Sequence, residues 1–289
     1  MSVPRKHHYL PQFYLARWAM GGTVHRYVRP RGAHFSVHVK SVTPAAVGYE
    51  EGLYSLPSED TPLEQQRLEM EFFQVIDARA ATALCKLERG EHGTADDKIA
   101  FAQFILSLFH RTPGRLQWMS ERLKEAIEND PEIDLTSGGF EAALKAQTGE
   151  LLGSLVGSTT ATQKIAEMRM FRIDVTASKR SLLTSDRPAM LSNTLIDRDS
   201  FILLPCGPRS IVVAAHDEEV AKAFSSQRPD ALVRSVNDAV VRQAEGLVVA
   251  SNRTATAFVE KRLMRSAASL AHALDENGMP RWKAPLDRR

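Results

Sequence analysis

The spacing of apolar residues changes twice along this chain, and each change indicates a different kind of structure. Residues 22–42 alternate valine, tyrosine and histidine with polar residues around a Pro-Arg-Gly-Ala stretch. Such alternation around a proline and glycine turn predicts an antiparallel β-hairpin. Residues 47–57 predict a short strand or an extended loop. From Thr61 to about residue 170 the apolar residues recur with helical spacing instead.

The first predicted helix covers residues 62–89. Thr61 and Glu64 form a capping-box pair, Pro62 occupies the first helical position, and Gly90 predicts the end of the helix. We expect one apolar face of this helix to pack into the core. That face consists of Leu68, Phe72, Val75, Ile76 and Ala80.

A second helical stretch begins at Thr94 with another capping pattern. Its first half is so apolar that we expect it to cross the core, and Pro113 and Gly114 predict a bend or a break. Residues 139–170 predict one or two more helices.

From Met170 the alternation typical of strands returns. Four stretches up to His216 predict antiparallel strands joined by short turns. Two amphipathic helices, a short apolar strand and a last helix follow in residues 217–224, 230–244, 245–251 and 254–274. We therefore predict an α+β fold, in which a helical central region packs with antiparallel β-hairpins from the N- and C-terminal parts. Because no linker is visible, residues 1–275 are expected to form a single domain, followed by a loosely ordered basic tail over residues 276–289.

The composition is that of an ordinary globular protein, with 43% hydrophobic and 25% charged residues. The formal net charge of +2, from 37 basic and 35 acidic side chains, gives no general attraction to nucleic acid or membranes. The N-terminus lacks the apolar core of a signal peptide, and no apolar run approaches the ~20 residues that span a bilayer. We expect a cytoplasmic protein without a membrane partner. Cys85 and Cys206 have no CxxC neighbour, which favours two free, buried and reduced thiols.

Two short stretches carry the first candidate residues. The adjacent pair His7 and His8 either bonds to buried backbone or a carboxylate, or it serves a metal or catalytic site. The stretch Thr-Ser-Asp-Arg-Pro at residues 184–188 either forms a turn capped by Asp186 or presents a catalytic carboxylate at a strand end. The sequence leaves both alternatives open.

Two more candidates lie on the predicted helices. His110, Arg111 and Arg115 lie close to the helix break, where arginines bind phosphate or carboxylate groups, or simply occupy an exposed helix end. Glu64, Glu71 and Asp77 belong to an acidic face that either lines a cleft or is solvated. The strong signatures of zinc proteases, P-loop and dinucleotide-binding proteins and α/β-hydrolases are absent, as are helix-turn-helix and zinc-finger spacings.

Five of these stretches together resemble the domain-of-unknown-function family 4238. They are, in order, HHYLPQFYLARW, EFFQVIDARAATAL, RTPGR, LLTSDRPAM and VNDAVVRQAEGLVVAS, and they span about residues 5–252. The chain departs from the family pattern at Asp77, where a second glutamate is usual, and at a turn that reads Pro-Cys-Gly-Pro. The resemblance implies positions rather than an activity. Those positions are His7, His8, Pro11, Gln12, Tyr14, Glu71, Asp77, Arg111, Ser185, Asp186, Pro188 and Asn237.

Polar side chains dominate these positions, which favours a site over a packing motif. One hypothesis is a hydrolase, such as a nuclease, acting on a phosphate-containing substrate or nucleic acid. His8, Glu71, Asp77 and Asp186 would then bind Mn²⁺, Zn²⁺ or Mg²⁺. The catalytic set would be His8, Glu71, Arg111, Asp186 and Asn237, with Arg111 stabilising the transition state and Asn237 orienting substrate or water.

The second hypothesis is a non-catalytic module that binds a ligand or a protein. In it the same polar groups form a buried hydrogen-bond network. The two hypotheses predict different geometry. An enzyme would bring His8, Asp186 and a helix carboxylate within ~5 Å around an open cleft, whereas a network would pair them with backbone groups.

Overall fold

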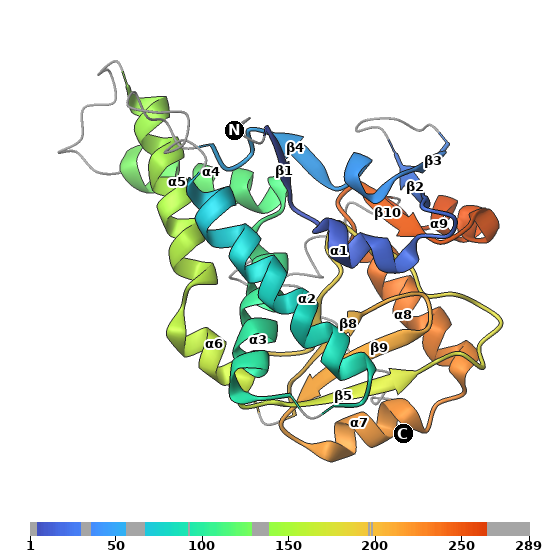
Figure 1. The fold of residues 1–289 in the computed structure, drawn as a ribbon. Coiled ribbons are helices and arrows are strands. Elements are labelled where there is room, and N and C mark those ends of the chain that lie inside the picture. The colour runs from blue at the N-terminus through green and yellow to red at the C-terminus, as the bar shows by residue number, and fades with distance from the viewer. Residues whose placement is uncertain are drawn as a thin grey trace.

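Two four-stranded antiparallel sheets and a group of helices make up the described part of this computed structural model (Figure 1). The structure describes residues 5–29, 36–55, 67–91, 93–128, 139–195, 197 and 199–264. The helices of the central region lie on one side in Figure 1, and most strands lie on the other with the C-terminal helices. This arrangement confirms the predicted α+β class.

The first sheet joins the two ends of the described chain. Its order is β3 (His38–Val42), β2 (Val24–Val28), β10 (Leu247–Ala250) and β6 (Thr184–Ser185). The predicted N-terminal hairpin is confirmed by β2 and β3, although its turn lies outside the described residues. Strands from both ends of the described chain thus share this sheet, and the single domain over residues 1–275 stays a prediction.

The second sheet is built from the C-terminal half alone. Its order is β5 (Arg169–Asp174), β9 (Ser210–Ala215), β8 (Phe201–Pro205) and β7 (Met190–Leu191). A separate two-stranded ribbon pairs β1 (Lys6–His8) with β4 (Tyr49–Glu51), which places His7 opposite Glu50. The double-histidine segment is therefore a strand tied into the fold.

The helices follow the predicted order closely. In the central region they are α2 (Gln74–Glu88), α3 (Ala95–His110), α4 (Pro113–Glu128), α5 (Phe140–Val156) and α6 (Thr159–Ala166). The remaining helices are α1 (Gln12–Leu15), α7 (Glu218–Ser225), α8 (Pro229–Gln243) and α9 (Thr256–Glu260). Short 3₁₀ turns cover η1 (Ala16–Trp18), η2 (Pro44–Ala46) and η5 (Arg253–Ala255), and a π-helix, η4 (Leu68–Phe73), precedes α2.

Local sequence signals set several of these boundaries. Thr94 caps α3 through a reciprocal capping box with Asp97. Pro113 begins α4 after the two residues that follow α3, as a residue without an N–H group can. Gly90 follows α2 with a φ of +73°, a conformation that glycine adopts without strain.

The core-facing side of the first central helix differs from the prediction. Val75 is 49% exposed, and Leu68 and Phe72 are only partly buried. Ile76 and Ala80 are buried as predicted, and the other buried residues on η4 and α2 are Glu69, Phe73, Ala83 and Leu84. Residues 69, 73, 76 and 80 follow i, i+4, i+7 and i+11 spacing, so the prediction was wrong by one residue in the first two turns, at Leu68, Phe72 and Val75.

The aromatic N-terminal run packs into the core. Leu10, Tyr14, Leu15 and Trp18 are fully buried and join a hydrophobic cluster with α2, α3 and α6. A second cluster lies between the sheets and α7 and α8, and it includes Phe201, Phe224 and Val236. The N-terminal segment thus belongs to the folded core rather than to a fraying end.

Other predictions have mixed outcomes. Cys206 is a buried free thiol as expected, but Cys85 on α2 is an exposed free thiol. None of the described helices has both the length and the apolar character that crossing a membrane requires. The predicted cap at Thr61 and Glu64, and the tail at 276–289, lie outside the described residues.

Candidate functional site

The two adjacent histidines have different surroundings. His7 is fully buried, and its Nδ1 accepts a hydrogen bond of 2.8 Å from the backbone N–H of Tyr54. His8 is half-buried, and its Nε2 lies 3.4 Å from the carbonyl oxygen of Ala45. Burial lowers the pKa of His8, and the nearby guanidinium of Arg111 adds to that effect. His7 is therefore held inside the fold, and His8 is the more accessible imidazole.

Tyr54 connects two of the sequence motifs. Its ring stacks on His7 at 5.4 Å between centroids with an interplanar angle of 8°. Its hydroxyl donates a 2.7 Å hydrogen bond to the backbone carbonyl of Arg111 at the end of α3. The N-terminal strand and the Arg-Thr-Pro-Gly-Arg segment are thus held together through one buried tyrosine.

Arg111 is completely buried, which is unusual for an arginine. Its Nη1 donates to Asp77 Oδ1 on α2 at 3.0 Å, and its guanidinium lies 5.5 Å from the centre of the Phe73 ring. The Nε and Nη2 atoms are buried and have no acceptor among the described residues. Burial raises the pKa of Asp77, and the pairing with Arg111 opposes that rise.

Glu69 was not predicted, yet it belongs to this cluster. Its side chain is 7% exposed, and Oε2 is buried without a donor in the described part of the chain. Burial raises the pKa of Glu69 to about 7, and Arg111 opposes that rise. Glu71, the predicted residue, is exposed on the same π-helix. The i+4 and i+7 spacing from Glu69 to the buried Phe73 and Ile76 is the signal that could have found it.

The carboxylate of Asp186 binds backbone. Its Oδ1 accepts from the N–H of Glu245 at 2.9 Å, and its Oδ2 accepts from Gly246 at 2.8 Å and Leu247 at 2.9 Å. The residue is only 5% exposed. Burial and then the nearby Glu245 carboxylate raise the pKa of Asp186, while the three N–H donors oppose that rise. Asp186 therefore ties the turn after β6 to the start of β10.

The rest of this turn is also buried. The Ser185 hydroxyl accepts a hydrogen bond of 3.2 Å from the N–H of Arg187, and Pro188 is buried. The Arg187 guanidinium lies 3.7 Å from the carboxylate of Glu245. The Glu245 carboxylate lies against Gly114 in the first turn of α4. The two are so close that a methyl group added to Gly114 would overlap the carboxylate. The turn thus meets the Arg-Thr-Pro-Gly-Arg segment through Glu245.

Asn237 and Tyr14 likewise bond to the fold. The Asn237 amide on α8 accepts from the Leu183 N–H at 2.8 Å and donates to the Ser181 carbonyl at 2.9 Å. The Tyr14 hydroxyl lies 2.9 Å from the Thr184 hydroxyl and donates to the Pro205 carbonyl at 2.8 Å. Pro11 begins α1 by accepting from two of its N–H groups, whereas Gln12 is exposed. Asn237 and Tyr14 are both buried in the interior.

The predicted metal-ligand set is not assembled. Within the described residues, no three or more histidine, cysteine, aspartate and glutamate side chains are grouped so that they could hold a metal ion. Asp77 pairs with Arg111, Asp186 binds three N–H groups, and Glu71 points to solvent. The prediction that His8, Glu71, Asp77 and Asp186 form a Mn²⁺, Zn²⁺ or Mg²⁺ site is therefore corrected by the geometry.

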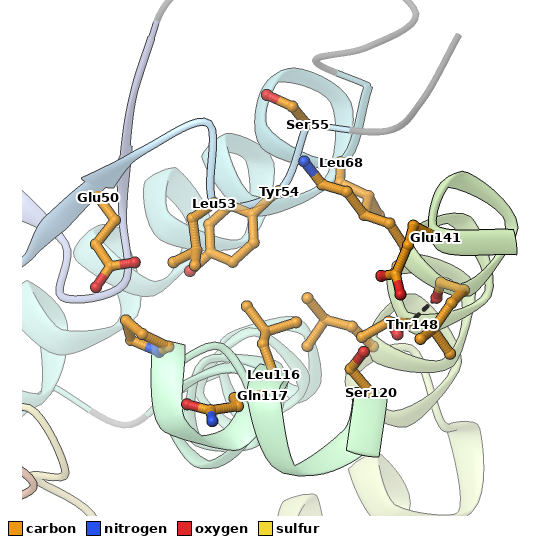
Figure 2. Close-up of a pocket in the computed structure, with 15 residues that line it drawn as sticks. Glu50, Leu53, Tyr54, Ser55, Leu68, Leu116, Gln117, Ser120, Glu141 and Thr148 are labelled. Atoms are coloured by element: carbon orange, nitrogen blue, oxygen red, sulfur yellow. Dashed lines mark hydrogen bonds between the residues drawn. The ribbon is translucent and has the colours of Figure 1, made fainter. Parts of the chain in front are cut away.

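A cavity of about 730 Å³ lies beside this network, between the segment after β4 and helices α4 and α5. Figure 2 shows Leu53 and Tyr54 on one side facing Leu116 and Gln117 on the other. Glu50 lies at one end of the cavity, and Glu141 and Thr148 lie at the opposite end. Its middle is apolar and its ends carry polar groups, an arrangement found in small-molecule sites.

The motif residues support the wall of this cavity. Tyr54, which His7 and Arg111 hold by hydrogen bonds, presents its ring to the cavity, and Pro113 of the arginine-containing segment lines it as well. The sequence did not show this site, because apart from Pro113 its lining residues are apolar or polar residues outside the five motif stretches.

Comparisons with known proteins agree with the resemblance drawn from the motifs. No curated protein and no solved structure matches the chain. Residues 6–254 match the DUF4238 family, described as proteins of unknown function. The chain therefore belongs to the DUF4238 family.

Proposed function

We propose that this protein is a binding module for a small molecule, and that the family's polar motif residues form the buried frame of its pocket. The observation that carries the proposal is the position of Tyr54. His7 and Arg111 fix its backbone and its hydroxyl, while its ring lines the 730 Å³ cavity. Residues that the family pattern emphasises thus set the shape of a ligand-sized space.

The hydrogen bonds of the motif residues favour binding over catalysis. Asp186, Asn237 and Tyr14 all bond to backbone groups in the interior. A general base or a metal ligand needs a lone pair directed at a reacting atom or an ion. Side chains that already accept or donate to the backbone specify a packing arrangement instead.

The lining indicates the chemistry of the ligand. Leucines 53, 68, 116, 144 and 152 give the cavity an apolar middle. Glu50, Glu141 and Lys145 line it too, and none of these has an ion-pair partner in the described part of the chain. We infer an elongated molecule with an apolar body and charged or polar ends, because apolar burial supplies affinity while the ends set orientation.

A fluorescence titration with 8-anilinonaphthalene-1-sulfonate tests the pocket, since this probe has an apolar aromatic body and one anionic group. Leu116 is half-buried on α4 and faces the cavity, so Leu116→Trp should fill it without removing a core side chain. We expect the dissociation constant to rise about tenfold or more, which corresponds to a loss of about 1.4 kcal/mol.

Leu116→Met is the matched control, because it keeps nearly the same volume and should bind the probe as the wild type does. Thermal unfolding of each variant shows that the fold is kept. Equal probe affinity in wild type and Leu116→Trp, with unchanged unfolding temperatures, would refute the proposed pocket.

Hydrolysis of a phosphate ester is a second candidate, and one observation favours it. The unpaired Nε and Nη2 donors of Arg111 lie near Glu69, whose pKa burial raises to about 7. Perturbed carboxyls beside arginines are frequent in active sites. Turnover of bis(p-nitrophenyl) phosphate above the buffer rate, lost in both Arg111→Lys and Glu69→Gln, would support this candidate. The absence of any turnover by the wild type would leave the binding function.

A further inference from the structure

A second cavity lies on another part of the molecule. It has a volume of about 580 Å³ and shares no lining residue with the first cavity. Its walls come from α1 and η1, the C-terminal half of α2, strand β5 and the turn between β8 and β9. Figure 1 shows the C-terminal end of α2 beside β5 and β9, where this cavity lies.

Three arginines from three different segments line this cavity. They are Arg17 after α1, Arg172 on β5 and Arg209 in the β8–β9 turn. Glu88 is the single acidic residue among the described lining residues, and it pairs with Arg17. The lining therefore carries an excess of positive charge, although the chain as a whole is nearly neutral.

Arg209 is a fixed cation. Its Nη1 donates to the carbonyl oxygens of Ser178 at 2.7 Å and Arg180 at 3.0 Å. No carboxylate within the described ranges lies within ion-pair distance of its guanidinium. These bonds use only the Nη1 atom. The N–H groups of Nε and Nη2 form the other edge of the guanidinium, and this edge can bind two oxygens of one oxyanion.

The other two arginines also use only one guanidinium nitrogen each in their described hydrogen bonds. Arg172 pairs with Asp174 through Nη2 at 3.1 Å, and Asp174 does not line the cavity. Arg17 uses Nη1 for Glu88 and for the carbonyl oxygen of Cys206. Its Nε is buried and has no acceptor among the residues that the structure describes. An anion in this cavity would therefore meet guanidinium groups already held in place, which reduces the entropic cost of binding.

We propose that this second cavity binds the phosphate or diphosphate group of a small molecule through Arg17, Arg172 and Arg209. Arginine suits this task, because its planar fork matches the oxygens of a phosphate and stays charged at every physiological pH. A volume of about 580 Å³ also accommodates the organic part of a small ligand. This site is independent of the proposed function of the first cavity.

Cys85 supplies a local readout of occupancy. It lines the same cavity and is exposed, whereas Cys206 is buried and the chain has no third cysteine. Alkylation by iodoacetamide, a neutral reagent, therefore reports mainly on Cys85. Inorganic pyrophosphate is the probe, with citrate and sulfate at equal ionic strength as the carboxylate and simple-anion arms.

We expect pyrophosphate to slow the alkylation of Cys85 saturably. Arg172→Gln, which alters a partly exposed side chain, should weaken that protection about tenfold, as expected for the loss of a charge-assisted hydrogen bond. Arg209→Gln should weaken it at least as much. Arg122→Gln is the matched control, because Arg122 is an exposed arginine on α4 that does not line the cavity.

The outcomes separate clearly. Protection by pyrophosphate that falls in Arg172→Gln and stays unchanged in Arg122→Gln supports the site. Stronger protection by citrate than by pyrophosphate would overturn the phosphate assignment. Absent protection, or equal protection in the wild type and both cavity variants, would overturn the site itself. Urea unfolding of Arg209→Gln shows whether its turn stays folded, and Arg172→Gln decides the question if it does not.

Discussion

Replacing Asp186 by alanine is the sharpest test of the buried network. The Asp186 carboxylate accepts hydrogen bonds from three consecutive backbone N–H groups, those of Glu245, Gly246 and Leu247, at 2.8 to 2.9 Å. Alanine removes the acceptor of all three N–H donors. The change is made in the interior, because Asp186 is only 5% exposed. The perturbation therefore acts on the connection between β6 and β10.

The magnitude follows from the hydrogen bonds and from burial. Each buried donor without an acceptor costs about 1 to 3 kcal/mol, and bonds to a charged group lie at the upper end. Removing the carboxylate also removes the cost of burying it near Glu245, which offsets part of this loss. We expect Asp186→Ala to lower the free energy of unfolding by about 3 to 5 kcal/mol.

Asp186→Asn refines the test. The amide keeps the size of the side chain but has one acceptor oxygen, so it can satisfy at most part of the three donors. Its loss of stability should therefore lie between those of the wild type and Asp186→Ala. Urea unfolding followed by far-ultraviolet circular dichroism near pH 7 gives the midpoints for all three proteins.

Asp174 provides the matched control. Its carboxylate is about half exposed and accepts from a single backbone N–H, that of Thr176, at 2.8 Å. Asp174→Ala should cost less than about 1 kcal/mol, as is usual for exposed positions. An Asp186→Ala variant as stable as Asp174→Ala would refute the structural role assigned to Asp186.

Glu69→Gln should flatten the fall in unfolding free energy between about pH 4.5 and pH 7. Burial raises the folded-state pKa of Glu69 to about 7, so in this range the folded protein keeps a proton that the unfolded carboxyl has lost. The free energy of unfolding therefore falls as the pH rises, by at most about 3 kcal/mol. Urea titrations at several pH values measure this slope, and an unchanged slope would contradict the assignment. Gly114→Ala should lower the unfolding temperature because its methyl group would overlap the Glu245 carboxylate, and Glu245→Ala should rescue it. Strictly additive losses would show that the two residues do not touch. Tyr14→Phe should cost about 1 to 2 kcal/mol in urea unfolding, since its hydroxyl meets Thr184 in the core, and a neutral result would exclude that bond.

Local structure could be predicted because its causes lie within a few residues. Thr94 and Asp97 cap α3 reciprocally, and Pro113 follows its end. The alternation of residues 22–42 predicted the pairing of β2 with β3. The aromatic residues that follow the two histidines are fully buried, which fits a segment tied into the fold.

The choice of buried face was harder to predict. Glu71 was expected in the site, yet Glu69 is the glutamate near Arg111. A carboxylate at residue 69 looks solvated in the sequence, because nothing local indicates that it faces a buried arginine more than 40 positions away. The π-helix at Leu68–Phe73 further alters which side chains point inward.

The sequence by itself determined the α+β class, the order of helices and strands, and the residues that the family pattern emphasises. Only the tertiary structure decided what those residues contact. The partners of Asp186 lie about 60 positions along the chain, and Tyr54 meets Arg111 across 57 positions. Helix caps and strand alternation arise from forces between near neighbours, whereas networks and cavities arise where distant segments pack together. The physical reason is that periodicity along the chain indicates the type of element and roughly which side is buried, but it does not indicate which distant surface will cover that side.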